Sequence, residues 1–188
     1  MRDMIKLGLV LLIICAISAF ILGVTNDYTQ GIIQARAHEE NVAAIKVLLP
    51  EAEEFELVED ANVTGVTDIV EVYQGTKNGE VVGYTVKSNP QGYGGRVDIL
   101  IGISIDGIIT GAKVGDNTET PGLGTKIADA AFINQFLDKA TTNEFQVTKD
   151  PQRENDIETV TGATVSSEAV ARGINRSTQL FEEVLKNR

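Results

Sequence analysis

The chain has 188 residues and a formal net charge of -11, with 27 acidic residues against 16 basic ones. This length allows one modest folded domain with its own hydrophobic core, and the acidic balance without clustered Lys or Arg argues against nucleic acid as a partner. Cys15 is the single cysteine of the chain, which excludes an internal disulfide.

The N-terminal run from Leu7 to Val24 contains no charged residue and is about long enough to cross the hydrocarbon of a bilayer as a helix. Arg2 and Lys6 precede this run and the first charge after it is Asp27, so the positive-inside bias predicts a cytoplasmic N-terminus. A cleaved signal peptide is the alternative, but the apolar run continues past the small residues that resemble a cleavage site. We therefore expect residues 1–26 to form a transmembrane anchor.

The segment after the anchor predicts a helix from Asp27 to Leu49, which Pro50 ends. His38 lies among charged residues and is the only histidine, so we interpret it as a surface residue rather than a metal ligand. The acidic run from Glu51 to Asp60 lacks the alternate spacing of a calcium loop, and we interpret it as a solvated loop or a turn of helix. Residues 27–67 are thus expected to be a membrane-proximal helix and linker.

Two hairpins are predicted next, each from two alternating runs that flank a two-residue turn ending in glycine. Their arms are residues 68–74 with 81–87 and residues 96–105 with 108–114, joined by Asn78-Gly79 and Asp106-Gly107. These runs predict an antiparallel sheet of at least four strands.

Two glycine-containing loops accompany the sheet. The glycines of Gly92-Tyr93-Gly94-Gly95 allow positive φ and close approach of the backbone to another group, so we predict a loop and leave a ligand contact open. In the second loop, Glu119 to Gly124, Pro121 fixes one turn and a glycine stands on either side of Leu123. A planar ligand could lie there against bare backbone and one aliphatic side chain. The alternative is a plain Pro-Gly turn that leads into a helix.

The remaining elements are mostly helical. A helix is predicted from Thr125 to Ala140, and we interpret its phenylalanines as core residues rather than as groups that stack on a ligand. A short strand is predicted at residues 144–148, and a last helix with an apolar stripe from Ser167 to Lys186. The fold class is therefore α+β, with an N-terminal transmembrane helix followed by an antiparallel sheet and packed helices.

Small residues and hydroxyls converge just before the last helix, in Thr161-Gly162-Ala163-Thr164-Val165-Ser166. One interpretation is an ordinary helix start, because Thr and Ser are preferred N-caps and Gly and Ala are common in tight turns. The other is an attachment point for a phosphate, because a helix N-terminus offers unpaired N–H groups and the positive end of the helix dipole.

Glu119-Thr120-Pro121-Gly122-Leu123-Gly124, followed downstream by Thr161-Gly162-Ala163-Thr164 and preceded by one membrane helix, resembles the FMN-binding G subunit of the Rnf electron-transport complex. The related C subunit of the sodium-translocating NADH:quinone reductase is similar but typically longer. The resemblance covers essentially the whole chain, including Gly92-Tyr93-Gly94-Gly95 and the order of elements. Four residues are a weak motif, whereas the two motifs in this order behind an anchor are strong.

The resemblance implies where a cofactor is attached. In that family a flavin transferase joins FMN through its phosphate to the last Thr of a [Ser/Thr]-Gly-Ala-Thr motif, and Thr164 occupies that position here. Thr161 keeps the hydroxyl of the commoner Ser, and Glu158 stands where Asp is usual. Thr164 is thus expected to be a tether for covalent FMN and not a catalyst. The residues implied in cofactor binding are Thr161, Gly162, Ala163, Thr164, Val165, Thr120, Pro121, Gly122, Leu123 and Gly124.

The function that the resemblance implies is that of an electron-carrier subunit in a membrane-bound, ion-translocating ferredoxin:NAD oxidoreductase, not catalytic alone. Its partners would be the other membrane subunits and, during maturation, a flavin transferase. Residues 68–188 would be the FMN-binding domain on the extracytoplasmic side of the cell membrane.

Other functions remain as alternatives. The chain could be the equivalent flavin subunit of a sodium-translocating NADH:quinone reductase, or a membrane-anchored binding or assembly module without flavin. A hydrolase with Thr164 as its nucleophile is disfavoured, because the only histidine is His38 and no Lys lies near the motif to act as an activating base.

Overall fold

The computed structural model describes residues 2–59 and 66–188, without the side chains of residues 2–4, 27, 28 and 30–43. The interpretation of His38 as a surface residue therefore falls outside the described side chains. The chain divides into two compact units, Met1–Ala43 and Ala44–Arg188.

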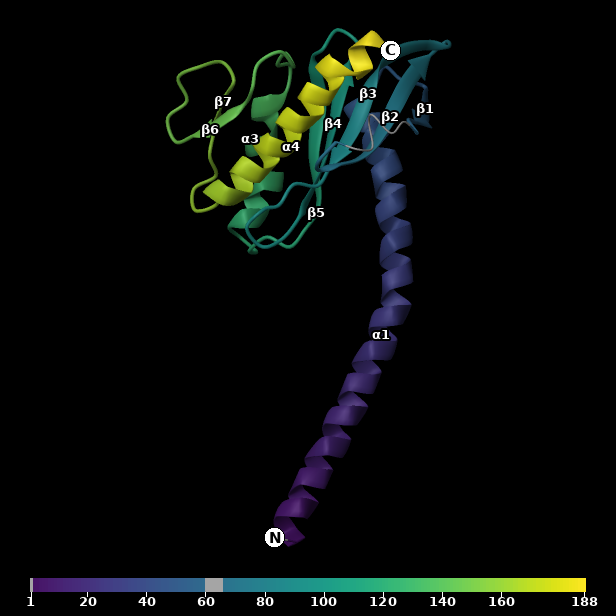
Figure 1. Ribbon diagram of the computed structural model, residues 1–188, viewed down its shortest axis with the longest axis vertical. Coiled ribbons are helices and arrows are strands. Elements are labelled where there is room, and N and C mark those ends of the chain that lie inside the picture. Colours follow the sequence, from purple (N-terminus) through teal and green to yellow (C-terminus); the bar gives the residue numbers. More distant parts are fainter. Residues whose placement is uncertain (1, 60–65) are drawn as a thin grey trace. The chain divides into compact units, whose positions relative to one another are not determined.

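The first helix, α1, spans Arg2–Leu48 without a break (Figure 1). Its part Ile5–Asn26 has a mean hydropathy of 2.9 and no buried side chain, so its length and composition would allow it to cross a membrane. The helix predicted from Asp27 onward is confirmed, and it continues the apolar helix directly.

Five antiparallel strands form one sheet in the order β1-β2-β3-β4-β5. Their bounds are β1 Glu54–Leu57, β2 Ile69–Lys77, β3 Glu80–Ser88, β4 Val97–Ser104 and β5 Ile109–Asn117. Both predicted hairpins are confirmed, since β2 pairs with β3 and β4 with β5. In the first turn, Asn78 and Gly79 have φ of 53° and 83°, the positive values that a two-residue turn between twisted strands requires.

The edge strand β1 corrects one expectation. A loop or a turn of helix over Glu51 to Asp60 is wrong at Glu54–Leu57, which pairs with β2. Only Phe55 is partly buried there, and the other side chains of the strand are exposed. Backbone pairing holds the strand, while acidic side chains suit an exposed edge because they discourage pairing with another chain. The acidic composition therefore concealed the strand.

One face of the sheet packs against α4 (Thr164–Glu183), which lies across β3 and β4 (Figure 1). The apolar stripe of α4, with Ile174 and Phe181, joins Tyr84 and Ile101 of the sheet in the main core. The rings of Phe181 and Tyr84 meet edge-on, with centres 6.2 Å apart. This packing of helix on antiparallel sheet confirms the α+β class.

The opposite face of the sheet holds the end of α1. Residues 44, 45 and 48 form a second apolar cluster with Leu100, whose side chain points away from the main core. A Cβ at Gly102 would lie 2.2 Å from the carbonyl oxygen of Leu48, so only glycine admits the helix end here. Thr110 donates its hydroxyl to the same carbonyl, which satisfies one of the acceptors that a helix C-terminus leaves unpaired.

The helix predicted from Thr125 to Ala140 is wrong as a single element. Its place is taken by η1 (Gly124–Ala128), α3 (Ala130–Ile133) and η2 (Asn134–Phe136). Asp129 interrupts the run because its backbone is extended, with ψ of 141°, and it starts α3 instead of continuing η1. The phenylalanines are core residues as predicted, since Phe136 is fully buried and lies edge-on to Phe132. The apolar spacing thus identified the buried side chains but not the backbone that carries them.

A small parallel pair of strands, β6 (Gln146–Thr148) and β7 (Asp156–Glu158), lies outside the main sheet. β6 confirms the short strand predicted at residues 144–148, whereas β7 is too short to show a periodic pattern in the sequence. The last helix is confirmed as α4, although it begins at Thr164 rather than at Ser167, and η3 (Leu185–Asn187) follows it.

Candidate functional site

Three distant segments meet at the side chain of Glu119, which is only 4% exposed. Its Oε1 accepts hydrogen bonds from the backbone N–H groups of Tyr93, at 2.8 Å, and Gly94, at 3.2 Å. Its Oε2 accepts a hydrogen bond of 2.7 Å from the hydroxyl of Ser166. The glycine-rich loop, the Pro-Gly loop and the first turn of α4 are therefore joined by one buried carboxylate.

Two glycines make room for this carboxylate. A Cβ at Gly92 would lie 2.2 Å from Oε1 of Glu119, and one at Gly124 would lie 2.7 Å from Oε2. Gly124 is buried, so it packs on Glu119 instead of baring backbone for a ligand beside Leu123. By contrast, Gly122 is exposed, has φ of 74° and faces open space, which leaves it available for a ligand.

The two predicted motifs are adjacent in the structure. Leu123 is 48% exposed, and its Cδ2 lies 3.4 Å from where a Cβ at Gly162 would stand. Gly162 has φ of 81°, a value that favours glycine and lets the chain turn into α4 beside the leucine. The loop that carries Leu123 is closed by hydrogen bonds from its N–H to the Thr120 carbonyl and from the Gly122 N–H to the Thr125 hydroxyl.

The start of α4 differs from an ordinary capped helix. Its N-cap is Ala163, which is buried and makes no side-chain hydrogen bond, so the interpretation of the hydroxyls as an N-cap is wrong. Ser166 is bonded to Glu119, and the hydroxyl of Ser167 donates to the Ala163 carbonyl. These two serines are buried, whereas Thr161 and Thr164 are exposed. Two of the four hydroxyls are thus open to a reagent from solution.

Exposed apolar side chains extend from all three joined segments. Tyr93 is 72% exposed, and Leu123 and Val165 are each 48% exposed. Pro121 and Thr120 are exposed beside Leu123. These side chains offer exposed apolar area on each of the three segments that Glu119 joins.

Three cavities of the domain are lined by residues outside the two motifs. Two cavities of about 380 Å³ each lie along α4 and share Asn175 and Gln179 in their walls. A third, of about 220 Å³, is lined by Thr159 and Val160, just before the hydroxyl stretch, together with Lys126. Thr164 lines none of these three cavities, and its side chain is exposed.

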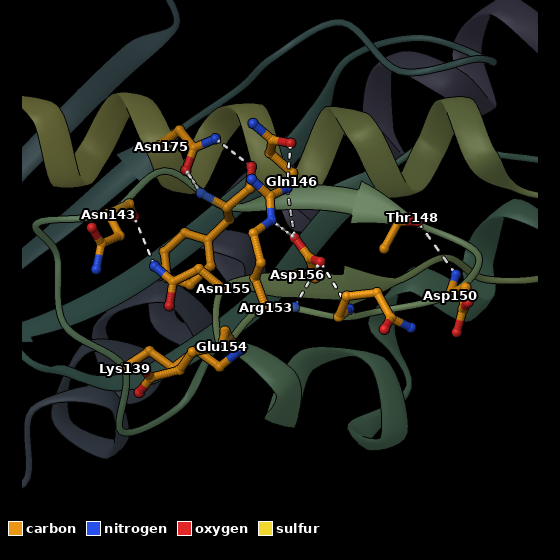
Figure 2. A network of polar contacts seen from close by, with 12 residues as sticks. Lys139, Asn143, Gln146, Thr148, Asp150, Arg153, Glu154, Asn155, Asp156 and Asn175 are labelled. Carbon is orange, nitrogen blue, oxygen red and sulfur yellow. Dashed lines mark hydrogen bonds and ion pairs between the residues drawn. The ribbon is translucent and has the colours of Figure 1, made fainter.

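A second polar cluster holds the segment around β6 and β7 (Figure 2). Asn175 of α4 both donates to and accepts from the backbone of Phe145, each at 2.9 Å. Arg153 and Asp156 form an ion pair at 2.8 Å. Backbone N–H groups of Gln152 and Arg153 lower the pKa of Asp156 below its ordinary value, with help from the Arg153 side chain. None of these residues belongs to the predicted cofactor site.

The two predicted motifs are adjacent in the structure, but sequence reasoning did not assign a role to Glu119 or Ser166. The buried state of Glu119 depends on donors at residues 93, 94 and 166, far from it in the chain. Acidic residues are rarely fully buried, and the residues next to Glu119 in the chain show no pattern that predicts its burial. The glycines at positions 92 and 124 were the available signal, because each stands where a side chain would meet this carboxylate.

Known proteins resemble this chain in sequence and in fold. Residues 92–179 match the family described as FMN-binding domain. The G subunit of the Na(+)-translocating ferredoxin:NAD(+) oxidoreductase complex of Acetobacterium woodii is 41% identical, over 96% of this chain and 93% of that protein. The G subunit of the ion-translocating oxidoreductase complex of Methanosarcina acetivorans is 33% identical, over 93% of this chain and 92% of that protein.

Two solved structures share the fold at low sequence identity. The crystal structure of Shewanella oneidensis NqrC has a TM-score of 0.54 and 16% identity, covering 74% of this chain and 73% of that one. The C subunit of the Na(+)-translocating NADH-quinone reductase from Parabacteroides distasonis has a TM-score of 0.55 and 22% identity, covering 70% of this chain and 77% of that one.

Proposed function

The chain belongs to the family of G subunits of ion-translocating oxidoreductase complexes and contains an FMN-binding domain, and on this premise we propose that Thr164 carries FMN as a covalent phosphoester. The protein then serves as an electron-carrier subunit of a ferredoxin:NAD oxidoreductase complex that moves ions across a membrane. It is not catalytic alone, because its own side chains only hold and orient the cofactor.

The observation that carries the proposal is the exposure of Thr164 at the first position of α4. Its hydroxyl can be reached by a transferase, whereas Ser166 and Ser167 are buried and hydrogen-bonded. The N-cap residue, Ala163, makes no side-chain hydrogen bond, so its side chain does not compete with a phosphate for the N–H groups of the first turn. A phosphate at this position is stabilised by those N–H groups and by the positive end of the helix dipole.

The residues around Thr164 fit the rest of the cofactor. Gly162 has no side chain and lies against Leu123, so the aliphatic side chain and the bare turn form one surface beside the tether. Exposed Tyr93 and Val165 add apolar area on the neighbouring segments. When bound, FMN supplies the chemistry of accepting and passing on electrons, while the protein supplies position and electrostatic surroundings.

Covalent attachment suits a carrier on the outer side of a membrane. The tether prevents loss of the cofactor and keeps it at high effective concentration near its redox partners. The apolar helix Ile5–Asn26, with Arg2 and Lys6 at its start, supports a cytoplasmic N-terminus and an FMN-binding domain on the extracytoplasmic side. Active alkaline phosphatase fused to the C-terminus would support this orientation, whereas a fluorescent cytoplasmic reporter at the same place would contradict it.

The attachment is tested by making the full-length protein with a flavin transferase and following in-gel flavin fluorescence after denaturation. We expect wild type to fluoresce and to gain the mass of one FMN, and Thr164→Ala to lose both completely. Thr142→Ala is the matched control, because Thr142 is an exposed threonine outside both motifs and its loss should leave the adduct in place. Fluorescence that persists in Thr164→Ala would refute the tether.

The mass of the protein, together with an electron-transfer assay, separates the alternatives. Wild-type protein without an added mass would favour an anchored assembly module that carries no flavin. An FMN adduct together with electron transfer to a quinone, and none from ferredoxin, would favour the role of the flavin subunit in an NADH:quinone reductase. The fold likeness to the two solved structures, at 16% and 22% identity, supports the shared architecture alone.

A further inference from the structure

Glu119 is a buried carboxylate for which the proposed attachment at Thr164 has no use. It is 4% exposed, and among the residues that the structure describes no Lys or Arg lies within ion-pair distance of it. Its charge is instead met by hydrogen bonds from Tyr93 N–H, Gly94 N–H and the Ser166 hydroxyl. A carboxylate taken out of water is costly, so the three donors must stay in place for the charge to be tolerated.

The donors belong to the segments that surround Thr164. One oxygen of Glu119 accepts hydrogen bonds from the N–H groups on both sides of the Tyr93 Cα, and so fixes the backbone that carries the exposed Tyr93 ring. The other oxygen holds Ser166, two residues after Thr164 and in the first turn of the same helix. Glu119 also begins the loop that carries Leu123. Its backbone N–H donates a hydrogen bond to the side-chain oxygen of Asn117.

Packing restricts the carboxylate to this arrangement. Gly92 lies over Oε1 and Gly124 over Oε2, each too close to accept even a methyl group without displacement. The side chain therefore has little freedom to exchange one donor for another. Three segments share this buried junction, and each presents an exposed apolar residue.

We propose that Glu119 is a positioning residue that orients the flavin ring of the Thr164-linked FMN, by holding the segments of Tyr93, Leu123 and Val165 in one arrangement. This inference rests on the proposed function. Glu119 itself is buried beneath the loops and acts through them. Without the Glu119 carboxylate, FMN stays attached to Thr164, but its ring no longer contacts a fixed surface.

The test compares full-length, flavinylated wild type with Glu119→Ala, Glu119→Gln and the matched control Asn175→Ala. Asn175 joins α4 to the backbone of Phe145, so the control also breaks two hydrogen bonds to α4 but away from Glu119. The readouts are covalent flavin by in-gel fluorescence, fluorescence anisotropy and visible circular dichroism of the flavin, and amide hydrogen exchange of peptides around residues 93 and 145.

In Glu119→Ala we expect covalent flavin to persist while its anisotropy falls and its visible circular dichroism drops to less than about half, because a ring without fixed contacts tumbles. Amide exchange around residue 93 should rise by about tenfold or more, with no change around residue 145. Asn175→Ala should show the reverse pattern of exchange and unchanged flavin signals. Glu119→Gln keeps an acceptor for the two N–H groups and an amide for Ser166, so it should recover most of the wild-type signals.

The other outcomes contradict either the positioning role of Glu119 or the proposed function. Flavin signals that are unchanged in Glu119→Ala, or lost equally in Asn175→Ala, would overturn the positioning role while leaving the attachment at Thr164 intact. Wild type without covalent flavin would overturn the proposed function and this inference with it. If Glu119→Ala does not fold, Ser166→Ala takes its place, because it removes one of the three donors. It should lower the flavin anisotropy and circular dichroism by a smaller amount, and wild-type signals in that variant would contradict the positioning role.

Discussion

Two places in the domain join distant segments through polar side chains, and they do so in opposite ways. At Glu119, a buried carboxylate receives three donors, and glycines at positions 92 and 124 leave space for no other side chain. Around β6 and β7, amide side chains and the Arg153–Asp156 pair link loops near the surface (Figure 2). The first junction depends on packing as much as on hydrogen bonds, whereas the second is held by hydrogen bonds and an ion pair.

The two places differ in their relation to the candidate site. The junction at Glu119 connects the segments that bear Thr164 and its exposed apolar neighbours, so it controls the geometry of the candidate site. The cluster around β6 and β7 contains none of the predicted site residues, and Asn175 couples it only to the middle of α4. We expect changes at the first to affect both stability and flavin, and changes at the second to affect stability alone.

The largest effect is expected from Gly124→Ala. The new Cβ would lie 2.7 Å from Oε2 and 2.8 Å from Cβ of Glu119, so the carboxylate must leave its donors. We expect a loss of about 2–3 kcal/mol in the free energy of unfolding, typical of overpacking. Urea unfolding of the detergent-solubilised protein, followed by intrinsic tyrosine fluorescence, measures it, since the chain has no Trp.

Gly115→Ala is the control for that substitution. Gly115 lies in β5, and its Cβ would make an ordinary contact of 3.4 Å with Asp98, so the change should stay within about 0.5 kcal/mol. Equal losses for Gly115→Ala and Gly124→Ala would mean that the two glycines act through backbone freedom and not through space for the carboxylate.

A smaller effect is expected from Asn175→Ala in the second cluster. The substitution leaves the N–H and carbonyl of buried Phe145 without these partners, at a cost of about 1–2 kcal/mol. Gln179→Ala, at an exposed position one turn further along α4, should change stability by less than about 0.5 kcal/mol. The same urea titration checks both. A reduced flavin circular dichroism in Asn175→Ala would break the separation between the two regions.

The smallest effect concerns acid stability at Asp156. Backbone N–H groups of Gln152 and Arg153 lower the pKa of this carboxyl below its ordinary value of 3.8. A group whose pKa falls on folding contributes stability above its unfolded pKa, and this contribution is lost as the pH falls through the folded pKa. The stability difference between wild type and Asp156→Asn should therefore be constant from neutral pH to about pH 5 and shrink below about pH 4.

Urea midpoints measured across this range test the acid effect, and a difference that does not change with pH would contradict it. The result also sharpens the comparison. The stability contributed by Asp156 depends on pH, whereas the stability lost in Gly124→Ala comes from packing and should be present at every pH in the range.

Local patterns predicted much of the fold. The turn at Asn78-Gly79 specified the first hairpin because a two-residue turn needs residues that tolerate positive φ, and Asp106-Gly107 marked the second, whose loop of residues 105–107 has positive φ at Gly107. The stripe of α4 was readable because helical spacing places its apolar residues on one face. The prediction of one helix over Thr125 to Ala140 was wrong, since the same apolar spacing is compatible with short helices separated by an extended Asp129.

The sequence by itself determined the N-terminal apolar helix, the hairpins, the last helix and the two motifs that mark the candidate FMN site. These features depend on residues within a few positions of one another, so composition and spacing are enough to reveal them. Only the tertiary structure decided that Glu119 is buried, that Gly124 packs on it, and that Thr164 is exposed while Ser166 is not. Burial and exposure depend on partners tens of residues away, which is why the residue that joins the site could not be found from its neighbours in the chain.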